Sequence, residues 1–305
     1  MPDQYHVSVD PHADNNPHSI ALRMVGAGHH VLEVGCWSGH VTEHLVAAGN
    51  TVVGVEIDVD AAARNGFADR VHVVDLDIVR LSGIESDRFD VIVLGDVLEH
   101  LRDPAATLAD LVGMLTDDGV LVVSIPNVAH IDVRLHLLSG HWDYQPAGLL
   151  DRTHLRWFTR ATLRDLLAGV GFVATDLEPV RFERNPTVLA VDEPVPHDAL
   201  RYIDADPDSR VFQFVVTARR ADGPNPEHDA LAPITVERSD VDAERALDVE
   251  RVRADIDDLR DAIAARDVEI EALRAEVDAW NNATLTRATR PLRALYGRIR
   301  RRISP

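Results

Sequence analysis

The chain has little of several features that mark particular classes of protein. It contains one cysteine, Cys36, and no lysine, so all 31 basic residues are arginine. A single cysteine excludes an internal disulfide framework and a cysteine-rich zinc site. No run of 18 consecutive apolar residues occurs, which argues against a membrane-spanning helix. The first residues do not show the basic start and apolar stretch of a signal peptide, so we expect none.

Positive charge is also scarce. The sequence has 51 acidic residues, and its formal net charge is −20. Binding to a phosphate backbone needs clustered positive charge, so we expect no nucleic-acid partner. Apolar residues make up 46% of the chain, which is enough to build a core. These features together predict a soluble, cytoplasmic protein.

Residues 1–220 alternate short apolar runs with helical patterns. Unbroken β-branched runs are typical of strands that are covered on both faces, and strand–helix alternation predicts an α/β fold with a parallel sheet. Strands are expected at 31–35, 51–57, 71–74, 89–94, 120–125, 172–182 and 211–219. Helices are expected at 41–48, 61–67, 104–115 and 161–168, with Asp103 and Thr159 as N-caps of the last two.

Residues 221–240 are polar and contain three prolines, which predicts a linker. From 241 to 280 apolar residues recur alternately three and four positions apart, which predicts a coiled coil. β-Branched residues at the a positions favour a parallel homodimer, and Arg266 weakens the seam at one d position. A solvated single helix is the alternative interpretation. The seam consists of Val249, Val252, Ile256, Leu259, Ile263, Arg266, Ile270, Leu273, Val277 and Trp280.

The tail, residues 281–305, reverses the charge of the rest of the chain, with seven arginines and no acidic residue. Apolar residues fall at helical spacing within it. This pattern predicts a basic amphipathic helix in peripheral contact with the inner face of a membrane. A protein partner could take the place of the membrane, and the alternatives are a disordered basic tail or one that binds the acidic body of the same chain.

One stretch, residues 31–39, indicates a ligand site. A buried strand leads into Gly35, and a helix is expected to begin near Gly39. Glycines let the backbone approach a ligand closely, and the following helix N-terminus offers unpaired N–H groups. Because Trp37 replaces a glycine, the stretch is not the dinucleotide-binding fingerprint.

Polar residues follow three further strands at the same expected edge of the sheet. Glu56 ends the second strand about 20 residues after the glycine loop, where a carboxylate accepts hydrogen bonds from ribose hydroxyls. Asp77 follows the third strand, and residues 95–100 follow the fourth. Ligands of open α/β sheets bind at the carboxyl ends of the strands.

Taken together, the motifs LEVGCWSG, VVGVEID, VVDLD and FDVIVLGDVLEHLRDP resemble the class I S-adenosylmethionine-dependent methyltransferases over about residues 30–125. The resemblance implies a Rossmann-like, seven-stranded, mostly parallel sheet with helices on both faces and an antiparallel final strand. It also implies S-adenosylmethionine as the cofactor, with the methionine end near Glu33, the ribose at Glu56, the adenine at Asp77 and the middle of the cofactor at Gly95. The full set of expected cofactor-binding residues is Glu33, Gly35, Cys36, Trp37, Gly39, Glu56, Ile57, Asp77, Ile78, Gly95, Asp96 and Val97.

A second set of motifs, SIPNVAH at 124–130 and LDRTHLRWFTR at 150–160, resembles a methyltransferase subgroup of bacterial glycan biosynthesis. This resemblance implies a sugar or glycan hydroxyl as the acceptor. A hydroxyl is a poor nucleophile, so we expect His154 or His100 as the base, with Asp151 orienting His154 or contacting the acceptor. No metal-ligand spacing appears, so no metal is expected. Two alternatives stay open: a small phenol- or quinone-like acceptor, and a non-catalytic scaffold that acts through the coiled coil.

Overall fold

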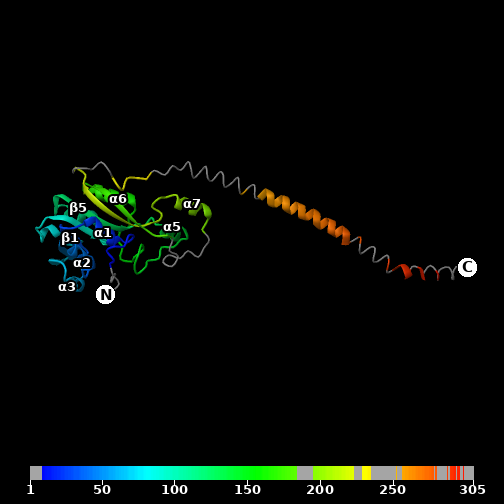
Figure 1. The fold of residues 1–305 in the computed structure, drawn as a ribbon, viewed down its shortest axis with the longest axis horizontal. Helices are drawn as coiled ribbons and strands as arrows, with labels where there is room; N and C mark the ends of the chain where they lie inside the picture. Colours follow the sequence, from blue (N-terminus) through cyan, green and yellow to red (C-terminus); the bar gives the residue numbers. More distant parts are fainter. Residues whose placement is uncertain are drawn as a thin grey trace. The chain divides into compact units, whose positions relative to one another are not determined.

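The computed structural model describes residues 9–183, 195–222 and 229–234, together with 252, 256–277, 279, 287, 289–292, 294, 295 and 298. The chain divides into two compact units, Met1–Val236 and Glu237–Pro305, which are considered separately. All described strands belong to the first unit (Figure 1).

The first unit contains the expected seven-stranded sheet, in the order β3-β2-β1-β4-β5-β7-β6. Strands β1 to β5 pair in parallel, and β7 runs antiparallel to both β5 and β6. The order reverses direction between β1 and β4, which places a crevice at their carboxyl ends. The strands are β1 (His30–Val34), β2 (Thr51–Glu56), β3 (Arg70–Val73), β4 (Phe89–Gly95), β5 (Leu115–Pro126), β6 (Phe172–Arg181) and β7 (Val211–Arg220).

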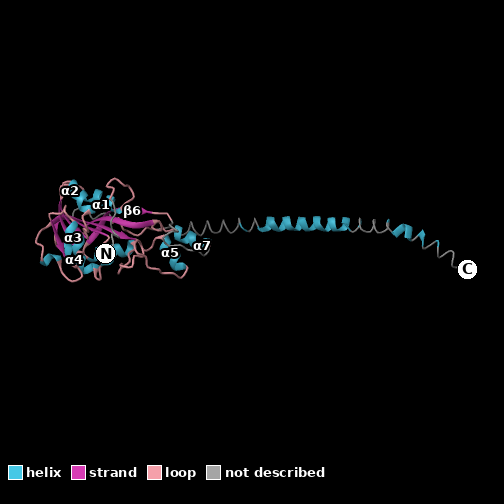
Figure 2. Cartoon of the chain, turned by 90° about the horizontal axis from the view of Figure 1, so that it is seen from below, coloured by secondary structure: helices cyan, strands magenta, loops and turns pink. Residues whose placement is uncertain are grey.

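Helices cover both faces of this sheet, as expected. On one face Ile20 of α1 and Leu45 of α2 pack in one apolar cluster, and on the other Leu108 of α4 and Leu163 of α6 pack in a second. Figure 2 shows α1 and α2 on the opposite side of the strands from α4. The helices are α1 (Pro17–Val25), α2 (His40–Ala47), α3 (Val59–Arg64), α4 (Pro104–Val112), α5 (Ile131–Leu138), α6 (Arg160–Gly169) and α7 (His197–Asp204), with short 3₁₀ turns η1 (Leu81–Gly83) and η2 (Leu98–His100).

Two predicted N-caps are confirmed. The Asp103 side chain accepts the N–H of Ala106 at the start of α4, and Thr159 forms a reciprocal capping box with Thr162 at the start of α6. The predicted helix at 104–115 was too long. The helix ends at Val112. Leu115 belongs to β5, because it pairs with Phe89 of β4 and so extends the sheet.

Part of the expected linker packs on the first unit. Leu231 is buried in the main apolar cluster, and Arg160 donates a hydrogen bond to the carbonyl of Ala230 at 3.0 Å. Arg164 pairs with Asp229 at 2.6 Å. The first unit therefore continues past the end of β7, and Leu231 packs in the same apolar cluster as the buried side chains of α6.

In the second unit, residues 256–277 are helical throughout. The apolar residues of the expected seam that fall in this range are 44–63% exposed. Most of the basic tail lies outside the described residues, although residues 289–292 within it are helical. Its contact with a membrane stays a prediction. No helix among the residues that the structure describes is long and apolar enough to cross a membrane.

Candidate active site

The loop after β1 has the backbone that its glycines predict. Gly35 and Gly39 have φ values of 74° and 94°, and Trp37 also lies in the left-handed region at φ 44°. A left-handed conformation is costly for a residue with a Cβ, so the loop around Trp37 is held by its surroundings. Gly39 is the N-cap of α2, where a side chain would collide with Asn65 at 2.7 Å.

Glu56 is what holds this loop. Its Oε2 accepts the backbone N–H of Trp37 at 2.9 Å, and its Oε1 accepts the N–H groups of Ile57 and Asp58, both at 2.8 Å. A carboxylate has about four acceptor positions, so three are used by the protein. Glu56 therefore fixes the glycine loop against β2 and keeps capacity for a ribose hydroxyl, and its contact with both ribose hydroxyls stays a prediction.

Glu33 and Cys36 lie beneath the loop. Glu33 is buried and accepts a hydrogen bond from the Thr42 hydroxyl at 2.6 Å. Burial, with a smaller contribution from the charge of Glu56, raises the pKa of Glu33 to about 8. Cys36 is only 2% exposed and packs against Gly54, and burial raises the pKa of its thiol to about 12. The side chain of Cys36 fills the space under the loop, so only its backbone is left to line a ligand, and that contact stays a prediction.

The expected adenine end of the crevice is open and apolar. Ile57 is 64% exposed and Ile78 is 80% exposed, which is unusual for such large apolar side chains on a folded domain. Asp77 accepts the backbone N–H of Arg102 at 2.9 Å and so links the β3 loop to the segment before α4. A cavity of about 250 Å³ borders Asp77 and Ile78 on the side of α4.

At the end of β4, Asp96 has a left-handed backbone (φ 56°) and receives a hydrogen bond from Gln213 of β7. Gln213 also donates to the Ser124 hydroxyl at 2.6 Å, so β5 and β7 both support this carboxyl. Burial raises the pKa of Asp96 to about 7, and a hydrogen bond from Ser124 opposes the rise. A cofactor centre with a positive charge would find this carboxyl partly ionised at neutral pH.

The three expected catalytic residues do come together. The rings of His100 and His154 lie edge to face, with their centroids 4.9 Å apart. The Nδ1 of His100 contacts the Thr153 carbonyl at 3.2 Å. Burial lowers the pKa of both imidazoles, and for His154 the neighbouring His100 lowers it further. Both rings are therefore largely neutral near pH 7 and able to accept a proton.

Asp151 acts through the backbone. Its Oδ1 accepts the N–H and the hydroxyl of Thr153 at 2.8 and 2.6 Å, and its carbonyl accepts the N–H of His154 at 3.1 Å. The side chain is buried, and its charge favours protonation of His100 and His154. Asp151 thus shapes the turn that carries His154, in keeping with the expected role of orienting that residue, and its contact with the acceptor stays a prediction.

Glu99 completes this cluster, and sequence reasoning did not select it. Its side chain is 1% exposed, and neither carboxyl oxygen has a hydrogen-bond partner; the same holds for Nδ1 of His154. Burial raises the pKa of Glu99 well above its ordinary value, and the charge of Asp96 adds to the effect. Its carbonyl accepts the N–H groups of Leu155 and Arg156 at 2.7 and 3.0 Å, which closes the 151–156 segment over the β4 turn.

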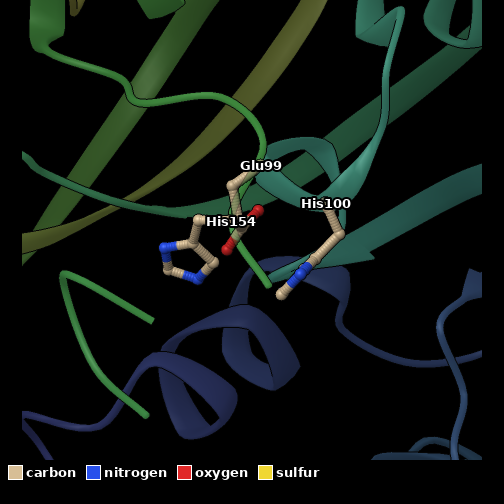
Figure 3. Close-up of side chains that lie close together, drawn as sticks. All are labelled: Glu99, His100 and His154. Atoms are coloured by element: carbon tan, nitrogen blue, oxygen red, sulfur yellow. The ribbon is translucent and has the colours of Figure 1, made fainter. Parts of the chain in front are cut away.

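Figure 3 shows Glu99 and His100 on one turn, with His154 approaching from the facing segment. One ligand atom from each lies within 4.8 Å of the other two. Within the residues that the structure describes, these two imidazoles and one carboxylate could supply three ligands to a cation, although the sequence offered no metal-binding spacing. Buried polar atoms without partners require an explanation, and proton transfer or a cation at this point supplies one.

The site residues described above lie in a segment that matches a known protein family. The family model described as "Methyltransferase domain" matches residues 15–177, which is more than half of the chain. The chain belongs to this methyltransferase family. The match begins before α1 and ends within β6, and so includes the glycine loop, Glu56, Asp96 and the histidine pair.

Curated relatives of this methyltransferase include two proteins named "Ubiquinone biosynthesis O-methyltransferase". The protein from Psychrobacter arcticus is 26% identical over 170 residues, which cover 52% of this chain and 65% of that protein. The protein from Bradyrhizobium diazoefficiens is 33% identical over 139 residues, covering 44% and 50%. The chain thus spans less than two thirds of the length of these relatives.

Solved structures similar to this methyltransferase include the 1,6-didemethyltoxoflavin-N1-methyltransferase of Burkholderia thailandensis, solved with bound 1,6-didemethyltoxoflavin and S-adenosylhomocysteine. It is 19% identical, covers 72% of this chain and 83% of its own, and gives a TM-score of 0.46. A methyltransferase from Archaeoglobus fulgidus described as S-adenosylmethionine-dependent gives 19% identity and a TM-score of 0.46.

The cofactor of this methyltransferase family is S-adenosylmethionine, and the residues present fit it. The exposed apolar side chains of Ile57 and Ile78 suit an adenine ring, and Glu56 keeps one acceptor position for a ribose hydroxyl. A Cβ added to Gly95 would meet no atom within 4 Å, so the backbone at the end of β4 faces open space.

Two further residues support Asp96: Gln213, which the sequence did not single out, and Ser124, which was noted only as part of the 124–130 motif. Gln213 and Ser124 are buried and hydrogen-bonded to each other, and Gln213 also binds Asp96. A signal for Gln213 was present, because it is the one polar residue in the apolar first part of β7, residues 211–216. Glu99 stands beside His100 in the sequence, but only the 3₁₀ turn reveals that its carboxyl is buried under the histidines.

Proposed function

We propose that this protein is an O-methyltransferase that methylates a hydroxyl group of a small ring-bearing molecule. The cofactor supplies a methyl group carried on a positively charged sulfur. A new carbon–oxygen bond forms as the carbon–sulfur bond breaks, and the hydroxyl proton passes to an imidazole nitrogen of His154 or His100. The observation that carries this proposal is the pair of imidazoles, His154 buried and His100 half-buried, that pack against each other beside the buried Glu99.

The chain's own residues support each part of the reaction. Glu56 fixes the loop that meets the cofactor, and Asp96 places a carboxyl where positive charge is expected. The 151–156 segment, closed over Glu99 by two backbone hydrogen bonds, holds His154 at the crevice. Fixing the base in this way lowers the entropy cost of proton transfer.

The acceptor class rests on two lines of support. The curated relatives are named for an O-methyltransferase of ubiquinone biosynthesis, which favours the phenol-like alternative over the sugar acceptor that the 124–130 and 150–160 motifs suggested. In addition, burial makes His154 and His100 weak bases. A weak base takes a proton from a phenol, with a pKa of about 10, far more readily than from an aliphatic sugar hydroxyl.

The test is an acceptor profile of the purified full-length chain with S-adenosylmethionine. We expect methylated catechols or phenols by mass spectrometry and no methylated saccharides. Methylation of saccharides alone would contradict the proposed acceptor class but not the proposed methyl transfer. Failure with every acceptor, together with no heat of S-adenosylmethionine binding, would instead support the scaffold alternative.

Variants of the histidines test the mechanism. His154→Gln and His100→Gln are expected to lower kcat by about 10²–10⁴-fold for the residue that removes the proton, with the cofactor Kd unchanged. His30→Gln is the matched control, because His30 begins β1 at the opposite end of the strand from the crevice. Equal turnover in all three variants contradicts a histidine base.

A further inference from the structure

The second unit has an apolar stripe along one helix. Within 256–277, the a and d positions of the heptad are filled by Ile256, Leu259, Ile263, Arg266, Ile270, Leu273 and Val277. The apolar members of this set are 44–63% exposed. An isolated helix gains little from such a stripe, whereas two helices that bury it against each other gain the hydrophobic stabilisation of a coiled coil.

The charges beside the stripe specify how a second helix is oriented. In a parallel pair, the g residue of one helix faces the e′ residue five positions later in the other. Glu269 at g then faces Arg274 at e′, and the sequence repeats this arrangement with Asp255 and Arg260. In an antiparallel pair g faces g′ and e faces e′, which would set Glu269 against other acidic g residues such as Glu276. The charges therefore match in one orientation only.

The single charged seam residue fits the same arrangement. Arg266 occupies a d position, where it flanks e′ of the partner helix. That e′ residue is Asp267, the one acidic e position within the described helix. The g residue that would otherwise pair with Asp267 is Ala262, which carries no charge. Asp267 is thus left to pair with Arg266 across the interface, and a shift of one heptad would separate them.

We propose that residues 256–277 form a parallel, in-register, two-stranded coiled coil with the same segment of a second copy of this chain. The g–e′ pairs set the orientation, and the Arg266–Asp267′ pairs set the register at a cost to affinity, as polar residues in coiled-coil seams do. The inference does not depend on the proposed methyl transfer.

Charge variants of the full-length chain test the pairing. In Glu269→Arg two arginines face each other, and in Arg274→Glu two glutamates do. Each change is expected to raise the dimer Kd about tenfold in analytical ultracentrifugation, because two attractive pairs become repulsive. The double variant restores the pairs with reversed sign and should return to within about threefold of the original Kd. Glu271→Arg, the same change at a b position, is the matched control and should leave the Kd unchanged.

Orientation has a separate readout. The one native cysteine, Cys36, is 2% exposed and therefore protected from labelling. Spin labels can be attached to cysteines introduced at Asp261 and Ala275, both f positions. A parallel, in-register dimer gives short distances between labels at both positions. An antiparallel dimer separates at least one pair by about 20 Å along the axis. A monomer at tens of micromolar, a trimer, a long distance at either position, or equal effects of Glu269→Arg and Glu271→Arg would each overturn the proposal.

Discussion

A Cβ atom at position 35 would lie 2.7 Å from Cγ2 of Val97, so the loop after β1 and the turn after β4 touch at one point. Both residues were expected at the cofactor from sequence alone, and the contact shows that they also position each other. Gly35 has φ 74°, where a side chain adds backbone strain to the collision.

We expect Gly35→Ala to lower the free energy of unfolding by about 2 kcal/mol and to weaken cofactor binding, since the two loops must move apart. Adding Val97→Ala removes the collision but leaves the strain, so the double variant should recover part of the loss. Urea denaturation and calorimetric cofactor titration measure both effects. Identical stability of the single and double variants would show that Val97 is not the obstacle.

Glu33 is expected to make stability depend on pH. The folded state keeps the proton of Glu33 up to a pKa of about 8, whereas the unfolded chain loses it near 4.5. Stability from this group is therefore present at low pH and falls as pH rises from about 4.5 to 8, by at most about 1.4 kcal/mol per pH unit. Glu33→Gln should remove that slope in urea denaturation between pH 5 and 8.5. The exposed Glu43→Gln is the control, and parallel curves for the wild type and Glu33→Gln would contradict the burial argument.

Asp96 is expected to couple cofactor affinity to pH. Its pKa is about 7, so the carboxyl becomes ionised as pH rises through neutrality. Binding of S-adenosylmethionine, which carries a positive sulfur, should strengthen from pH 6 to 8, while S-adenosylhomocysteine, whose sulfur is neutral, should show a flatter profile. Gln213→Met removes a donor to this carboxyl and should move the rise to higher pH. Equal profiles for the two ligands would place the positive charge away from Asp96.

Zinc is expected to inhibit through the cluster around Glu99. The orphaned oxygens of Glu99 and Nδ1 of His154 are available to a cation, and Zn²⁺ binds imidazole and carboxylate ligands together. A cation there occupies the lone pairs that the proposed base uses, so about one equivalent of Zn²⁺ should lower turnover about tenfold. Glu99→Gln should relieve the inhibition. If Zn²⁺ leaves turnover unchanged, or raises it, the imidazoles do not act as the free base.

The expected strands and the crevice followed from the sequence because they depend on local signals. Apolar, β-branched segments identified all seven strands, and Gly35, Glu56 and Asp96 lie at the carboxyl ends of strands that share one edge. Helix α5 was not predicted, because its buried Asp132 and His136 hide the apolar face that would have revealed it. Helix α1 was also missed, although Asn16 caps it and Pro17 begins it.

Long-range contacts account for the rest. No local sequence pattern indicates that the Glu56 carboxylate accepts three backbone N–H groups, or that the Cys36 side chain packs against Gly54. The motifs at 124–130 and 150–160 are recognisable in the sequence. The role of Asp151 in its turn, however, depends on the hydrogen bonds that it accepts from Thr153. Sequence patterns thus located the residues, and packing decided what each one does.

Leu231 bears on how this enzyme is shortened for experiments. A truncated form that stops directly after β7 would leave an apolar socket beside α6 filled with water, and Arg160 would lose its bond to the Ala230 carbonyl. Such a fragment is expected to aggregate, and its aggregation would be mistaken for a property of the catalytic unit. Fragments that retain residues up to 236 keep Leu231 in place and contain the whole first unit.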